Sequence, residues 1–274
     1  MARPRRLSRQ KRRQKKNFWG ILMICAVFIV IVITGFAFWQ LNKSHVEIDK
    51  ATLCPVLGAK ATTVVLIDRT DSMNPVQQGA LLQKLDDIKA ETPKYGAIEI
   101  YSVGQVGEAL LRPEVKLCNP GRGEDVDQTI GNPRLVEKRW KEGFQAPLER
   151  VFKDMLRPGE AKTSPIAESI QSVAITSFDA DNQSGADKRL VIVSDMLQNT
   201  PEFNQYVALT PFERFKTTEY YRRVRAHLDG VRVEILYVRR PTARQIQGEG
   251  HIEFWQQFFM DEGATLERVI ALEG

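Results

Sequence analysis

Acidic and hydroxyl side chains follow directly after an apolar run in residues 64–73, which read VVLIDRTDSM. Asp68, Thr70 and Ser72 stand at alternate positions just beyond this run, with no cysteine or histidine beside them. Carboxylate and hydroxyl oxygens are hard ligands, which suit Mg²⁺ or Ca²⁺ and suit Zn²⁺ or copper poorly. The segment therefore predicts a site for a hard divalent cation at the end of a buried strand.

Two further segments bring the same kinds of side chain to the end of a predicted element. Asp195 ends the apolar run RLVIVSD, and KTSPIAES places Ser164 just before a predicted helix. Because the carboxyl ends of parallel strands meet at one edge of a sheet, Asp195 and Asp68 are expected at the same edge. The alternative interpretation is that Asp68, Ser72 and Ser164 only cap helices and that no metal binds.

Short apolar runs rich in β-branched residues alternate with longer stretches of helical spacing from residue 61 onward. The predicted strands cover residues 62–68, 97–103, 109–118, 189–195, 231–238 and 264–272. The predicted helices cover about residues 75–91, 135–156, 165–178, 211–228 and 250–262. This alternation predicts an α/β fold with a doubly wound, mostly parallel six-stranded sheet that helices cover on both faces.

The motif DRTDSM, read as Asp-x-Thr-x-Ser, resembles the metal-ion-dependent adhesion site of von Willebrand factor type A (VWA) domains, Asp-x-Ser-x-Ser. TSPIAESI resembles the threonine-bearing loop and helix of that family, VIVSD resembles its distal aspartate, and the resemblance covers about residues 61–274. It implies a Rossmann-like sheet whose third strand is antiparallel to the first, and a bound Mg²⁺, Mn²⁺ or Ca²⁺. The implied ligands, direct or through water, are Asp68, Thr70, Ser72, Ser164 and Asp195, with Thr163 as a substitute for Ser164.

The resemblance also implies a disulfide between Cys54 and Cys118. In the implied topology both cysteines lie at the edge of the sheet opposite the metal, on next-but-one strands about 9.6 Å apart. The segment before residue 62 is long enough to close that gap. The bridge would clamp the segment before the sheet onto the domain, and free thiols are the alternative.

The first 60 residues divide into three parts of different composition. Residues 1–17 hold nine Lys or Arg and no acid, and residues 18–39 form an uncharged run of 22 residues with a tryptophan near each end. Such a run predicts a single transmembrane helix in the plasma (inner) membrane, and the basic tail beside it predicts a cytoplasmic N-terminus. Residues 40–60 are predicted to be a stalk, and residues 61–274 a periplasmic or extracellular domain. A basic tail can also bind nucleic acid, but next to a membrane span it is expected to signal topology and contact anionic lipid.

The predicted function is a non-catalytic protein-binding module. Four arginines, from the loop after residue 68 and the long connection 239–250, are expected to form a positive rim around the ion; ordinary solvated arginines are the alternative. They are Arg69, Arg239, Arg240 and Arg244. A rim of this charge favours a partner protein with an exposed carboxylate, and no nucleic acid is expected as a partner.

Two other functions remain open from the residues alone. One is a metal-independent structural scaffold of an envelope complex. The other is a metal-dependent hydrolase that uses Asp68 and Asp71, but hydrolysis usually needs a positioned base beside the ion. The three histidines, His45, His227 and His251, are scattered along the sequence and are expected to be surface or packing residues. The chain is therefore predicted not to be an enzyme.

Overall fold

The computed structural model forms two units, Met1–Glu47 and Ile48–Gly274. The structure describes residues 19–20, 22–36, 39, 46–70, 72–104, 110–126, 131–157, 159, 163–179 and 186–273. In the first unit residues 22–36 are helical, whereas the basic tail and residues 18, 21, 37 and 38 of the predicted span lie outside the described residues. Within the part of the chain that is described, no helix meets the length and apolarity needed to cross a membrane.

The second unit is built on a mixed sheet in the order β3-β2-β1-β4-β5-β6. Its strands are β1 (Ala61–Ile67), β2 (Ala97–Ser102), β3 (Val115–Cys118), β4 (Asp187–Ser194), β5 (Val231–Val238) and β6 (Thr265–Leu272). Neighbouring strands are parallel except for β3, which is antiparallel to β2. The predicted α/β fold is confirmed, and so is the reversed direction of the third strand.

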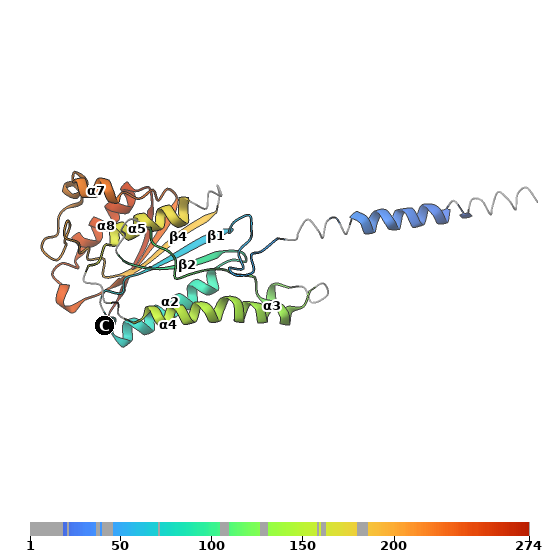
Figure 1. The fold of residues 1–274 in the computed structure, drawn as a ribbon, viewed down its shortest axis with the longest axis horizontal. Coiled ribbons are helices and arrows are strands. Elements are labelled where there is room, and N and C mark those ends of the chain that lie inside the picture. The colour runs from blue at the N-terminus through green and yellow to red at the C-terminus, as the bar shows by residue number, and fades with distance from the viewer. Residues whose placement is uncertain are drawn as a thin grey trace, which may run out of the picture. The chain divides into compact units, whose positions relative to one another are not determined.

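Helices cover both faces of this sheet (Figure 1). They are α2 (Pro75–Glu91), α3 (Pro133–Trp140), α4 (Ala146–Met155), α5 (Ile166–Val173), α6 (Phe212–Lys216), α7 (Glu219–Val224) and α8 (Glu249–Asp261). Wider π-type turns, Lys141–Gln145 and Ala174–Asp179, join α3 to α4 and extend α5, and short 3₁₀ turns lie at Gly123–Asp125 and Pro241–Ala243. The α2, α3 and α4 helices lie on one face, and α5, α7 and α8 on the other (Figure 1).

The two helical layers bury two separate apolar clusters because successive side chains of a strand point to opposite faces. In β1, Val64 and Leu66 pack with the α5 to α8 layer, whereas Val65 and Ile67 pack with the α2 to α4 layer. All four side chains are fully buried, as expected for a central parallel strand. This burial fixes the position of the end of β1, and therefore the position of Asp68, which follows the strand.

One predicted helix is interrupted. The stretch 211–228 forms α6 and α7 with a break at Thr217 and Thr218. The Thr218 hydroxyl donates to the carbonyl oxygen of Phe215 at 2.7 Å and accepts from the backbone N–H of Tyr221 at 3.1 Å. A threonine that bonds to the backbone in this way caps a new helix instead of continuing the old one.

The segment just before the sheet belongs to the second unit, so the predicted stalk is divided at residue 48. Cys54 and Cys118 form the expected disulfide, with their Cα atoms 4.7 Å apart, and the backbone N–H of Cys118 also donates to the carbonyl oxygen of Thr52 at 2.8 Å. Cys118 pairs with Ala97, the first residue of β2. The bridge therefore lies at the edge where the parallel strands begin, opposite the edge at which β1 and β4 end.

Candidate functional site

The ends of β1 and β4 bring two aspartates to neighbouring positions. Ile67 pairs with Val193 in the parallel ladder, and the backbone N–H of Asp68 donates to the carbonyl oxygen of Val193 at 2.8 Å. Asp68 follows β1 directly, and Asp195 follows β4 directly. Both side chains are buried, with 5% and 3% exposed. The two carboxylates therefore lie at one sheet edge, as the sequence predicts.

Hydroxyl groups surround the Asp68 carboxylate. Its Oδ2 atom accepts from Ser164 Oγ at 2.8 Å and from Ser194 Oγ at 2.9 Å. Its Oδ1 atom accepts from the hydroxyl of Thr70 at 2.7 Å and from the backbone N–H of Thr70 at 3.0 Å. These four hydrogen-bond donors therefore offset part of the desolvation free energy of the buried carboxylate. Ser194, the last residue of β4 and the neighbour of Asp195, was not among the predicted site residues.

The helix-capping alternative does not describe these residues. The N-cap of α2 is Asn74, whose side chain accepts from the N–H groups of Val76 and Gln77 in a capping box. The α5 helix has no side-chain cap, and the Ser164 hydroxyl points to Asp68. An antiparallel bridge between Ser164 and Asn199 holds this serine in place. The hydroxyls of Thr70 and Ser164 are therefore used at the sheet edge.

Asp195 pairs with an arginine. Its Oδ1 atom accepts from the backbone N–H of Leu197 at 2.9 Å, and its Oδ2 atom accepts from Arg240 Nε at 3.1 Å. Burial, and next the charge of Asp68, raises the pKa of Asp195 to about 6, although the Leu197 N–H and the Arg240 charge oppose this rise. The same guanidinium donates from Nη1 to the carbonyl oxygen of Ser72 at 2.6 Å. Ser72 thus joins the described site through its backbone.

A buried glutamine fixes the backbones that carry this ion pair. Gln247 donates from Nε2 to the carbonyl oxygens of Asp195 at 3.1 Å and Val238 at 2.9 Å. Its Oε1 atom accepts from the backbone N–H of Arg240 at 2.7 Å. Nothing in the sequence pattern singles out Gln247, because it lies in a loop 52 residues after Asp195.

The backbone of the turn after Asp195 is strained, and two side chains of α8 contact it. Met196 is fully buried and has φ of +59°, a left-handed conformation that non-glycine residues seldom adopt. Its carbonyl oxygen accepts from Trp255 Nε1 at 2.8 Å and lies 3.1 Å from His251 Nε2. Burial lowers the pKa of His251 to about 4, so the imidazole is neutral near pH 7. His251 is thus the packing residue that the sequence predicts, and it holds the turn.

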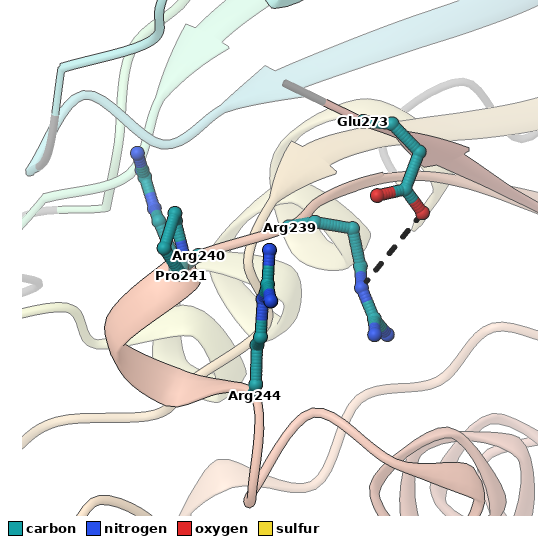
Figure 2. Close-up of a pocket in the computed structure, with 5 residues that line it drawn as sticks. All are labelled: Arg239, Arg240, Pro241, Arg244 and Glu273. Carbon is teal, nitrogen blue, oxygen red and sulfur yellow. Dashed lines mark ion pairs between the residues drawn. The ribbon is translucent and has the colours of Figure 1, made fainter.

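Three of the four predicted rim arginines line one pocket. The pocket has a volume of about 290 Å³ and is lined by Arg239, Arg240, Pro241, Arg244 and Glu273 (Figure 2). Arg239 Nε lies 4.0 Å from Glu273 Oε1, whereas the Arg240 side chain turns away from this pair (Figure 2). Arg69 instead donates from Nε to the carbonyl oxygen of Arg157 at 2.9 Å.

The donor chemistry at the sheet edge fits a hard cation. Two carboxylates and the hydroxyls of Thr70 and Ser164 come from three separate loops, and hard ions prefer such oxygen ligands. Across the described residues, no group of three or more His, Cys, Asp or Glu side chains is placed to hold a metal. A metal at this edge would therefore depend on hydroxyl ligands as well as on Asp68 and Asp195.

Comparison with models of protein families gives no match, and comparison with curated protein sequences also gives none. Among solved structures, the chain is similar to a crystal structure described as an aerotolerance-related membrane protein from Bacteroides fragilis NCTC 9343 with multiple mutations to serines. The two chains are 10% identical, the match covers 78% of this chain and 92% of the other, and the TM-score is 0.35.

Proposed function

We propose that this chain is a membrane-anchored, non-catalytic binding module of the VWA type. A divalent metal, Mg²⁺ or else Mn²⁺ or Ca²⁺, would be held by Asp68, Thr70, Ser72, Ser164 and Asp195 and would offer an open coordination position to a carboxylate of a partner protein. The observation that carries the proposal is the convergence of Asp68, Ser164 and Asp195 at one buried sheet edge. Three of the five proposed ligands are uncharged hydroxyls, so the ion would keep enough positive charge to attract a carboxylate from outside.

The residues of this chain would prepare the site before a partner arrives. Asp68 is oriented by Ser164, Ser194 and Thr70, and Asp195 is oriented by the backbone N–H of Leu197. Oriented ligands lose little conformational freedom when an ion binds. The arginine pocket supports an acidic partner, because Arg239 and Arg244 present positive charge beside this edge.

Anchoring and export are supported by separate features. The basic tail and the uncharged run 18–39 favour insertion with the N-terminus in the cytoplasm. The Cys54–Cys118 disulfide favours a periplasmic or extracellular domain, because cytosolic thiols are normally kept reduced.

A metal-independent scaffold is the second candidate function, and one observation favours it. The Arg240 guanidinium already supplies a positive charge to Asp195. The hydrolase candidate gains no comparable support, since His251 is fully buried and holds a turn, and Asp71 lies outside the described residues.

The first test uses the full-length protein in detergent and a random peptide library displayed on phage. Selection in Mg²⁺ should enrich peptides that contain Asp or Glu, and EDTA should weaken their binding by at least about tenfold. Asp68→Asn should cause a similar loss, because it removes the central carboxylate with little change of shape. The matched control is Asp87→Asn, at an exposed position of α2. Binding that survives both EDTA and Asp68→Asn would contradict metal-dependent recognition.

The second test concerns the arginine pocket. Arg244→Ala should weaken binding of the same acidic peptides about threefold to tenfold and should reduce the salt dependence of their association rate, as rim charges do. The control is Arg214→Ala, an exposed arginine on α6. The measurement is surface plasmon resonance at low and at physiological ionic strength. Equal losses in the two variants would mean that only net charge matters.

A further inference from the structure

A guanidinium group contacts two of the residues that are proposed to hold the metal. Arg240 reaches both Asp195 Oδ2, at 3.1 Å, and the carbonyl oxygen of Ser72, at 2.6 Å. Asp195 and Ser72 come from two of the three loops that supply the proposed ligands. The side chain of Arg240 is only 15% exposed, so its charge is directed into the site.

The position of Arg240 is fixed by the surrounding structure. Gln247 is 1% exposed and bonds to the backbone on both sides of the ion pair, at Arg240 N and at Asp195 O. A freely moving surface arginine would have no such support. The Arg240–Asp195 pair is therefore a built feature of the site.

Charge balance gives this pair a role. Asp68 and Asp195 are both buried at one edge, and hydroxyl donors satisfy Asp68 without adding positive charge. Within the described residues, Arg240 is the cation that pairs with Asp195. Buried carboxylates need a compensating cation, which can be a side chain or a metal.

We infer that Arg240 is a tethered cation that occupies the place of the divalent ion, so that the guanidinium and the metal exclude each other at Asp195. The inference rests on the proposed metal site and adds its regulation. The free protein then holds the site closed to metal, and metal enters only when Arg240 leaves Asp195. A partner carboxylate that pairs with the released Arg240 favours this exchange.

The test measures Mn²⁺ binding to the full-length protein in detergent by electron paramagnetic resonance. Arg240→Ala and Arg240→Gln should bind Mn²⁺ at least about tenfold more tightly than the wild type, because each removes the competing charge. Arg240→Gln keeps a hydrogen-bond donor for Asp195 and guards against misfolding of the alanine variant. The matched control is Arg244→Ala, which removes one positive charge from the same pocket and leaves the Asp195 pair intact.

A second readout is the melting temperature with EDTA and with Mn²⁺. Both Arg240 variants should melt below the wild type in EDTA, and Mn²⁺ should restore their stability while it leaves the wild type almost unchanged. A variant that stays unfolded in Mn²⁺ would overturn the inference, because the ion would then fail to replace the lost charge.

The remaining outcomes separate this inference from the proposed function. Equal Mn²⁺ affinity in the wild type and the Arg240 variants would overturn the exclusion and leave the metal site standing. An equal gain in Arg244→Ala would also overturn it, because net charge alone would explain the result. If no variant bound Mn²⁺, both the exclusion and the metal-dependent function would fall, and the scaffold function would remain.

Discussion

Glu234→Ala is expected to lower the free energy of unfolding by about 3–5 kcal/mol, because it breaks a buried ion-pair network. Glu234 lies on β5 and is 1% exposed. Its oxygens lie 2.8 Å from Lys84 Nζ, 2.6 Å from Arg189 Nη2 and 3.0 Å from Arg268 Nη2. Removing the carboxylate leaves three cations close together, and within the described residues only Arg189 keeps another carboxylate partner, Glu91 at 2.8 Å. Chemical denaturation of the full chain measures the loss.

The control for this prediction is Glu267→Ala on β6. Glu267 pairs with Arg232 at 3.4 Å, but both side chains are at least one-third exposed, so the expected loss is below about 1 kcal/mol. A Glu234 variant no less stable than the Glu267 variant would show that the network contributes nothing beyond an exposed pair.

The pH dependence of the same network has a definite sign. Burial alone would raise the pKa of Glu234, but hydrogen bonds and charges from Lys84 and Arg189 outweigh it, so the pKa is lowered. A carboxyl group with a lowered folded-state pKa contributes stability above its unfolded pKa of about 4.5. That contribution is lost as the pH falls through the folded-state pKa. The stability difference between wild type and Glu234→Ala should therefore shrink in acid.

The double variant Cys54→Ala/Cys118→Ala should lose about 2–5 kcal/mol of stability. The bridge joins residues 64 positions apart, so its loss gives the unfolded chain much more freedom. At about 2–4 °C per kcal/mol for a domain of this size, the melting temperature should fall by several degrees or more. Differential scanning calorimetry measures the shift.

Reductant provides the check on this second prediction. Dithiothreitol should lower the melting temperature of the wild type by a similar amount and leave the double variant unchanged. Cys25→Ala is the control, because Cys25 takes no part in the bridge. A reductant-insensitive wild type would show that the bridge does not stabilise the domain.

The sequence predicted the acidic residues of the site because each directly follows a strong strand signal. Asp68 and Asp195 end runs of buried β-branched residues, and parallel pairing then places them together. The supporting residues carried no such signal. Ser194 looked like an ordinary strand residue, and Gln247 acts across 52 residues from within a loop.

The sequence predicted the location of Arg240 but not its pairing with Asp195. Its place near the strand ends predicted a rim residue, and it does line the arginine pocket. Its side chain nevertheless points to Asp195, because Gln247 fixes the backbone at this position. Side-chain direction in a loop depends on long-range contacts that a local pattern does not contain.

The fold was easier to predict than the element boundaries. The six strands and the reversed β3 follow from apolar runs and the resemblance to VWA domains, whereas the break at Thr218 depends on one hydroxyl. The boundary between the two units falls at residue 48, inside the predicted stalk of residues 40–60, and Cys54 beyond it is buried and bonded to Cys118.

The placement of the disulfide has a mechanical consequence. The chain enters the second unit at Ile48, so a pulling force on the N-terminal segment meets the Cys54–Cys118 bridge before it meets β1. The load then passes through a covalent bond into β3, at the edge of the sheet where the parallel strands begin. Tension on the N-terminal segment would therefore be carried away from β1, and the sheet edge that carries Asp68 and Asp195, at the opposite end of that strand, would keep its geometry under load.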